Sequence, residues 1–158
     1  EGLLKNVLYQ MKYHQRKGLA KSLGRCVGQW VTTLKTQVDL IIPVPLSSQR
    51  LKERGYNQAE ELAKGMAQML HCSCRSFVER VKEKPALHSL SLQERNATLQ
   101  NVFQVRSQAA QKLKNKHLLL VDDILTTGST FNSLVTCLQP FQPQGICTFS
   151  VARTLKRD

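Results

Sequence analysis

The sequence has few acidic residues, few aromatic side chains and no long apolar run. Aspartate and glutamate number 11 against 23 lysines and arginines, so the formal net charge is +12 at pH 7. A positive surface favours anionic partners such as phosphates or nucleic acid, although some basic surfaces bind nothing. No apolar run approaches the ~20 residues of a membrane-spanning helix. The first residues, EGLLKNVLYQMKYHQRKG, also lack the apolar core and the cleavage site of a signal peptide.

The cysteines are too few and too scattered to form a disulfide framework. The chain has five, an odd number. Cys26, Cys137 and Cys147 lie in apolar patterns, which predicts small buried residues. Cys72 and Cys74 form one close pair without a second pair, which argues against a zinc site within this chain. Together these features favour a reducing cytoplasm.

The pattern of apolar residues predicts one compact α/β domain. A chain of 158 residues with 41% hydrophobic content is long enough to bury a sizeable core. Apolar spacing predicts helices over 3–11, 19–34, 57–70 and 130–139, and strands over 39–45, 76–81, 102–105, 117–123 and 146–154. Asn57 can cap the third of these helices, and Asn57 and Gln58 are expected to be structural contacts. Residues 82–100 are a long polar excursion in which a short helix is expected from Ser91. Strands that alternate with helices indicate a doubly wound, mainly parallel sheet with helices at the N-terminus.

The segment LLLVDDILTTGST, residues 118–130, carries the strongest chemical signal. Four aliphatic residues suit a strand buried on both faces, and two adjacent acids follow them as Asp122 and Asp123. Buried carboxylates are costly unless something compensates their charge. In doubly wound sheets, ligands bind beyond the carboxyl ends of the strands. The alternative is a strand end that meets solvent and then turns.

The turn after the acids has the composition of an anion cradle. It offers consecutive backbone N–H groups, hydroxyls and a helix N-terminus through Thr126, Thr127, Gly128, Ser129 and Thr130. The glycine permits a positive φ and a close backbone approach. The segment is not a Walker A loop, because it lacks the Gly-Lys-Ser/Thr ending. A phosphorylated sugar fits this pattern, with the acids on its hydroxyls and the cradle on its phosphate.

This segment resembles the signature for phosphoribosyl pyrophosphate (PRPP) in type I phosphoribosyltransferases. All its characteristic positions match: four apolar residues, two acids, two apolar residues and Thr-Thr-Gly-Ser-Thr. The stretches IIPVPLSSQRLKERGYNQAEELAK, residues 41–64, and SLQERNATLQNVF, residues 91–103, are similar to the ComF (competence protein F) branch, as is the closing VAR. The resemblance covers most of residues 1–155.

The resemblance implies a role for each group of residues. Asp122 and Asp123 would hold the ribose hydroxyls and stabilise positive charge at the anomeric carbon. The turn of residues 126–130 would hold the 5-phosphate. The leaving pyrophosphate would carry Mg²⁺, with no direct protein ligand to the metal. The pyrophosphate would meet Pro45, Leu46, Arg50 and Arg54, and a mobile catalytic loop would bring Lys82, Lys84, His88 and Arg95.

Two features depart from the family pattern. Relatives usually carry a cysteine-rich, zinc-binding segment before the first helix, and its absence leads us to expect a fragment. Where the family often has Thr-Pro-x-Gln, residues 84–87 read Lys-Pro-Ala-Leu. The family also binds its acceptor with a separate hood. Here the hood would come from the N-terminal helical segment, residues 1–37, or from the last residues, with residues 38–158 as the core of the same domain.

Two functions remain open on the sequence alone. The first is a phosphoribosyltransferase that transfers phosphoribosyl from PRPP to an unknown acceptor and releases pyrophosphate. The second is a non-catalytic competence factor that senses PRPP or binds single-stranded DNA, with competence-machinery proteins as partners, because the family is associated with DNA uptake. The intact acid pair favours PRPP binding in both. Base stacking needs exposed aromatic rings, which are sparse in this chain.

Overall fold

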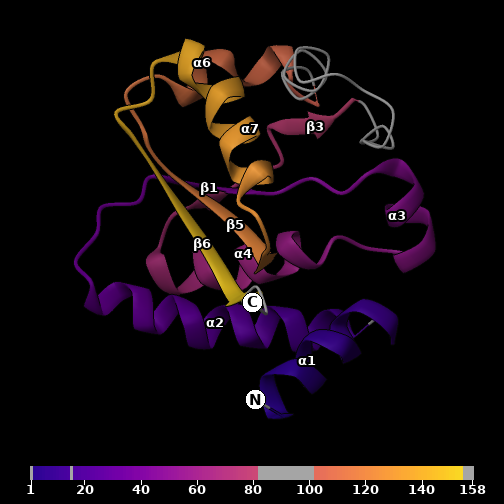
Figure 1. The fold of residues 1–158 in the computed structure, drawn as a ribbon. Helices are drawn as coiled ribbons and strands as arrows, with labels where there is room; N and C mark the ends of the chain where they lie inside the picture. Colours follow the sequence, from indigo (N-terminus) through magenta and orange to yellow (C-terminus); the bar gives the residue numbers. More distant parts are fainter. Residues whose placement is uncertain (1, 15, 82–101, 155–158) are drawn as a thin grey trace.

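A four-stranded parallel sheet forms the centre of the molecule (Figure 1). The computed structural model describes residues 2–14, 16–81 and 102–154. The sheet has the order β2-β1-β5-β6, made of β1 (Leu40–Pro43), β2 (Ser73–Cys74), β5 (His117–Leu125) and β6 (Gly145–Arg153). A separate antiparallel pair joins β3 (Val78–Arg80) and β4 (Phe103–Val105). The predicted parallel α/β sheet is confirmed, and the strands predicted over 76–81 and 102–105 form this separate pair.

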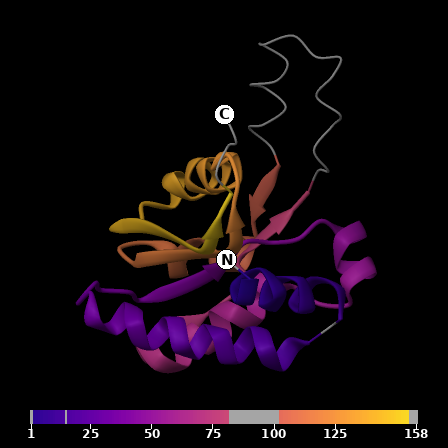
Figure 2. The ribbon, with the colours of Figure 1, turned by 60° about the horizontal axis from the view of Figure 1, so that its bottom comes forward.

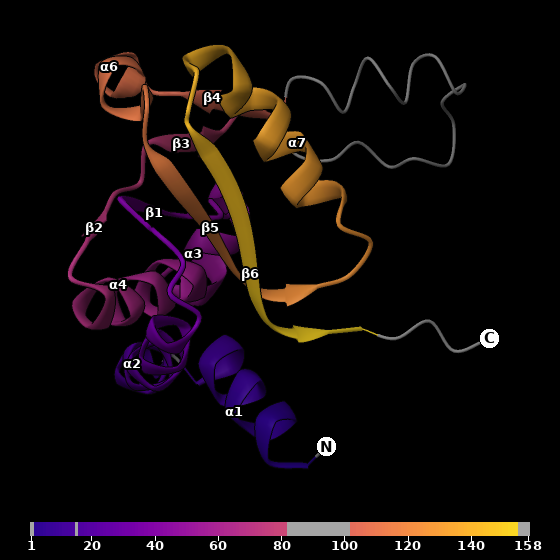
Figure 3. The same cartoon turned by 90° about the vertical axis from the view of Figure 1, so that its left-hand side faces the viewer.

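Helices cover both faces of the sheet, as expected for a doubly wound fold. Figure 2 shows α2 and α4 below the sheet and α7 above it, and Figure 3 shows β1, β5 and β6 side by side between them. The main helices are α1 (Gly2–Tyr13), α2 (Lys17–Thr33), α3 (Ser48–Arg54), α4 (Gln58–Leu70) and α7 (Ser129–Leu138). Shorter turns are η2 (Ser107–Ala109), α6 (Ala110–Leu113) and η3 (Gln139–Phe141). No helix in the described part of the chain is long and apolar enough to span a bilayer.

Alternation along the central strands builds two cores, one on each face. Leu118 and Leu120 of β5 pack with α7, while Leu119 and Val121 pack with α2 and α4. Successive side chains of a strand point to opposite faces, so an unbroken aliphatic run is the pattern that buries both. Each fully buried aliphatic side chain contributes about 1.5–3 kcal/mol. These cores hold the carboxyl ends of β1 and β5 in a fixed position.

The stripe of α2 that meets α4 has glycines at its centre, which corrects one prediction. Gly24 and Gly28 face α4, and a Cβ added at Gly24 would lie 2.1 Å from the Leu62 carbonyl oxygen. Because the helices meet through this stripe, Cys26 lies on the exposed side of α2. Cys147 is also exposed, on the edge strand β6. Both were therefore wrongly predicted to be buried, whereas Cys137 is half-buried.

Helix α3 was missed by the sequence analysis because it has no apolar stripe. Its one large apolar residue, Leu51, is 46% exposed. Local capping defines the helix instead: the Ser47 hydroxyl accepts from the Arg50 N–H at 3.3 Å. At the other end Gly55 adopts φ 71° and its N–H donates to the Leu51 carbonyl at 2.9 Å. This short helix displays the polar residues that follow β1.

Candidate functional site

The order in which the chain adds strands to the parallel sheet reverses between β1 and β5. The chain proceeds from β1 outward to β2, and from β5 outward to β6 on the other side. The two strands pair as far as Pro43 and Val121, and the Val44 N–H donates to the Val121 carbonyl at 2.9 Å. Beyond that point β1 leaves toward α3, whereas β5 continues to Leu125 beside β6. A crevice at such a reversal is the usual ligand site of an open α/β sheet.

A cavity of about 680 Å³ lies at this reversal, within the size range of small-molecule sites. Its wall combines five parts of the chain that are distant in sequence. They are Lys12 of α1; Val44, Pro45, Leu46, Ser47, Gln49, Arg50, Glu53 and Arg54 after β1; Arg80 of β3; Asp122, Asp123, Ile124, Thr126 and Thr130 at β5 and α7; and Thr154 after β6. The structure therefore brings the two acids together with all four residues predicted for pyrophosphate.

The two acids have different surroundings. Asp122 Oδ1 accepts from the backbone N–H of Asp123 at 2.8 Å. Burial, followed by the charge of Asp123, raises the pKa of Asp122 to about 7, and the positive charge of Lys12 opposes that rise. Asp123 Oδ2 is buried and lies 3.0 Å from Lys12 Nζ. The pair therefore combines Asp123, which lies beside a cation, with Asp122, whose pKa is raised by burial and by its neighbour.

The turn between β5 and α7 has the predicted shape. Gly128 adopts φ 78°, the left-handed region that a glycine enters without strain. The Thr127 hydroxyl donates to Ser129 Oγ at 3.0 Å and accepts from the Ser129 N–H at 3.4 Å. Thr126 and Thr130, on either side of this turn, line the cavity. The first turn of a helix carries N–H groups without intrahelical acceptors, which suits an anion.

Polar contacts hold the chain between β1 and α4 in place. The Asn57 side chain donates to the Val44 carbonyl at 3.0 Å and accepts from the Ala59 N–H at 3.1 Å, so it caps α4 as predicted. Arg54 Nη1 donates to Gln58 Oε1 at 3.0 Å. Asn57 and Gln58 therefore act as structural contacts beside the cavity, in agreement with the sequence analysis.

Lys12 is a cavity residue that the sequence analysis did not single out. The helix that carries it is held by Tyr56, whose hydroxyl donates to the Met11 carbonyl, and by Gln58 Nε2 at 3.5 Å from the same oxygen. Burial raises the pKa of Tyr56 to about 12, which keeps its hydroxyl protonated as a donor. No local pattern links positions 12 and 123, because their proximity arises only when α1 packs against the turn before α4.

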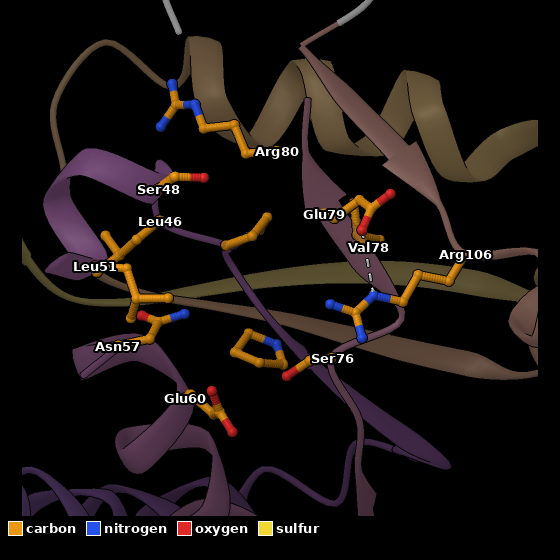
Figure 4. Close-up of a pocket in the computed structure, with 12 residues that line it drawn as sticks. Leu46, Ser48, Leu51, Asn57, Glu60, Ser76, Val78, Glu79, Arg80 and Arg106 are labelled. Carbon is orange, nitrogen blue, oxygen red and sulfur yellow. Dashed lines mark ion pairs between the residues drawn. The ribbon is translucent and has the colours of Figure 1, made fainter. Parts of the chain in front are cut away.

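A second, smaller cavity of about 270 Å³ lies between the chain that follows β1 and the strand β3 (Figure 4). Pro45, Leu46 and Arg80 line both cavities. In the smaller one, Arg106 Nε lies 3.6 Å from Glu79 Oε2. Its wall lacks the acid pair and the threonine turn, so the larger cavity is the candidate site. The predicted loop residues Lys82, Lys84, His88 and Arg95 lie outside the residues that the structure describes.

Comparison with known proteins agrees with this architecture. The family model of the phosphoribosyl transferase domain matches residues 54–157. The chain belongs to this family. It is 30% identical to DNA utilization protein YhgH of Escherichia coli strain K12, over 96% of this chain and 68% of that protein. It is also 30% identical to competence protein F of Haemophilus influenzae, over 96% of this chain and 66% of that protein. The resemblance to the ComF branch is therefore confirmed.

Solved structures support the fold of this family member. A hypoxanthine phosphoribosyltransferase from Staphylococcus aureus aligns with a TM-score of 0.53 and 16% identity, over 85% of this chain and 63% of that one. A protein described as the allosteric regulatory enzyme of purine biosynthesis aligns with a TM-score of 0.55 and 15% identity, over 82% and 25%. At these identities the likeness shows the fold, and it confirms the predicted type I phosphoribosyltransferase architecture.

Proposed function

We propose that the chain binds PRPP in the larger cavity and transfers its phosphoribosyl group to an acceptor, with release of pyrophosphate. The observation that carries this proposal is the meeting of three groups on one wall. The acid pair, Thr126 and Thr130 of the turn, and Arg50 and Arg54 of α3 line a single cavity. They match the three parts of PRPP, which are a diol, a 5-phosphate and a pyrophosphate.

Each group has a chemical task in this proposal. The ribose hydroxyls donate to Asp122 and Asp123, which also face the positive charge that develops as the bond from the anomeric carbon to pyrophosphate breaks. The turn of residues 126–130 holds the 5-phosphate. Arg50 and Arg54 bind the leaving pyrophosphate, because a guanidinium matches two phosphate oxygens at once. Among the loop residues, Lys82, Lys84, His88 and Arg95 remain predicted partners of pyrophosphate.

Magnesium would enter this site bound to the phosphates of the substrate. The described residues contain no group of three or more His, Cys, Asp or Glu side chains arranged to hold a metal. Mg²⁺ commonly binds through substrate phosphates and keeps several waters. Bound in that way, Mg²⁺ would neutralise part of the charge of the pyrophosphate. Arg50 and Arg54 would neutralise the rest from the wall of the cavity.

The N-terminal segment contributes one residue to the wall of the cavity. Lys12 of α1 lines the cavity together with Ile124 of β5 and Thr154 after β6. This arrangement supports residues 1–37 as the proposed hood over a core of residues 38–158.

Calorimetry with Mg²⁺ and PRPP tests the proposal, followed by a pyrophosphate-release assay against a panel of bases and amines. Saturable binding with release in the presence of one acceptor class supports the transferase. Binding without release by any acceptor would favour the PRPP-sensing alternative. Absence of binding at millimolar PRPP would overturn the PRPP site itself.

Single-stranded DNA binding is a second candidate function. Tyr9 and Tyr13 on α1 are 53% and 65% exposed, with ring centroids 4.7 Å apart, and Trp30 is 56% exposed. These rings could stack on bases beside a surface of net charge +12. The relatives named for DNA utilization and competence also favour such a role, with competence-machinery proteins as further partners.

Fluorescence anisotropy with a labelled oligonucleotide tests this candidate at two salt concentrations. Affinity should fall steeply between low and physiological salt. Tyr9→Ala with Tyr13→Ala should weaken it further, by roughly 1–3 kcal/mol per stacked base. Binding that is absent at low salt, or indifferent to salt, would remove this reading.

A further inference from the structure

Helix α1 is fixed against the candidate site by packing that is independent of the acids. Leu8 and Met11 are buried in a cluster with Ala20 and Tyr56. The Tyr56 hydroxyl donates to the Met11 carbonyl, in the last turn of α1, where carbonyls lack intrahelical partners. Lys12 is the next residue, so the position of its backbone is determined by these contacts.

The side chain of Lys12 reaches the acid pair in a sheltered place. Its Nζ lies 3.0 Å from Asp123 Oδ2, and the two side chains are only 19% and 13% exposed. A sheltered carboxylate that loses its cation either takes a proton or destabilises the fold. A carboxylate has about four lone-pair sites, so one lysine leaves acceptor positions available on Asp123.

We propose that Lys12 is a positioning residue of the site: its ammonium group holds the Asp123 carboxyl in place and oriented, so that the acid pair can accept ribose hydroxyls. This inference rests on the proposed function. Lys12 does not touch the reacting atoms in this account, and it acts through the carboxylates. A segment remote in sequence thereby becomes necessary for the motif to work.

The charges around the pair give the inference a pH signature. The charged and titratable groups that line the same cavity are Lys12 from α1, Arg50, Glu53 and Arg54 from α3, and Arg80 from β3. Tyr56, in the turn before α4, lies near enough for the charge of Asp123 to raise its pKa. Lys12 is the cation that lowers the pKa of Asp122 against the effects of burial and Asp123. Its removal should raise that pKa above about 7, so hydroxyl binding should require a higher pH.

The test measures the affinity for Mg²⁺ and PRPP by calorimetry between pH 6 and 9. The proteins are the wild type, Lys12→Met, Lys12→Arg, and Lys5→Met as a matched control. Lys5 is exposed on the same helix, so its variant loses the same charge away from the acids. We expect Lys12→Met to bind about tenfold more weakly at pH 7 and to shift the pH midpoint upward by about one unit.

The two other variants separate a positioning role from general effects of charge or folding. Lys12→Arg should restore the wild-type midpoint, and Lys5→Met should leave it unchanged. Wild-type affinity and midpoint in Lys12→Met would overturn the inference while leaving the PRPP site standing. If the wild type fails to bind PRPP, ¹³C NMR titration of the Asp122 carboxyl in the ligand-free proteins tests whether Lys12 lowers the pKa of Asp122. An equal midpoint in wild type and Lys12→Met would overturn the effect of Lys12.

Discussion

Two aspartates at opposite ends of the same strand pair differ in how the fold treats them. Asp39 stands just before β1, where its Oδ2 accepts from the His117 backbone N–H at 2.7 Å and lies 3.1 Å from the ring Nδ1. That backbone bond is the main cause that lowers the pKa of Asp39 below its usual value. Asp122 lies in β5 just beyond the opposite end of its pairing with β1, where burial and Asp123 raise its pKa to about 7.

The difference distinguishes a structural carboxylate, which stabilises the fold, from a carboxylate whose ionisation destabilises the fold. Asp39 links the starts of β1 and β5 through its bond to the His117 N–H, so folding stabilises its ionised form. Burial and the charge of Asp123 both disfavour the ionised form of Asp122. Perturbed carboxyls in a cavity are typical of functional sites, and the carboxyl ends of the strands are where such sites form. The predictions that follow test whether this division of roles is real.

The largest expected effect is loss of ligand binding when both acids of the pair become amides. Asp122→Asn with Asp123→Asn should weaken the binding of Mg²⁺ and PRPP about a thousandfold, or about 4 kcal/mol, because charge-assisted hydrogen bonds contribute about 1.5–3 kcal/mol each. Calorimetry measures the loss, and an unchanged circular dichroism spectrum controls for folding. Unaltered affinity in a folded double variant would remove the site assignment.

A gain in stability is expected from Asp122→Asn alone. The folded pKa of about 7 lies above the unfolded value of 3.8, so the folded state binds the extra proton between these values. Wild-type stability should therefore fall as pH rises from about 4 to 7, and the amide should escape this loss. Urea unfolding should show the variant more stable by on the order of 2–3 kcal/mol at pH 8, with little difference near pH 4. A destabilised variant at pH 8 would contradict the account.

The smallest expected effect comes from the opposite end of the strands. Asp39→Asn weakens the bond to the His117 N–H and should cost about 1–2 kcal/mol in the free energy of unfolding at pH 7. Because the folded pKa of Asp39 is lowered, this stabilisation is present above the unfolded value of 3.8 and is lost as pH falls through the folded value. Urea unfolding at pH 7 and pH 3 measures both. A variant equal to wild type at pH 7 would show that the bond contributes nothing.

The sequence predicted the parts of this comparison that depend on local pattern. The aliphatic run into Asp122 and Asp123 predicted the central strand and its burial on both faces. The strand continues past the acids to Leu125, because β6 pairs with it there. The cap at Asn57 followed from residue type and spacing. The four residues predicted after β1 and the threonine turn meet at the same cavity because parallel strands bring their carboxyl ends to one edge.

Other features depend on tertiary packing that no local pattern encodes. Lys12 reaches Asp123 only because α1 docks on Tyr56. Cys26 is exposed because α2 meets α4 through glycines, although Leu23, Val27 and Val31 of the same apolar pattern pack into the core. Helix α3 is defined by its caps and has no apolar stripe, so apolar periodicity does not predict it. The predicted loop of residues 82–100 lies outside the described part of the chain.

A side-by-side titration of Mg²⁺ and PRPP into the wild type, Asp39→Asn and Asp122→Asn at pH 8 tests the central claim most directly. Each variant exchanges one carboxylate for an amide of the same shape, at one end or the other of the same pair of strands. The account predicts wild-type affinity for Asp39→Asn and a loss of at least tenfold for Asp122→Asn. Equal losses in the two folded variants, or no loss in Asp122→Asn, would contradict it.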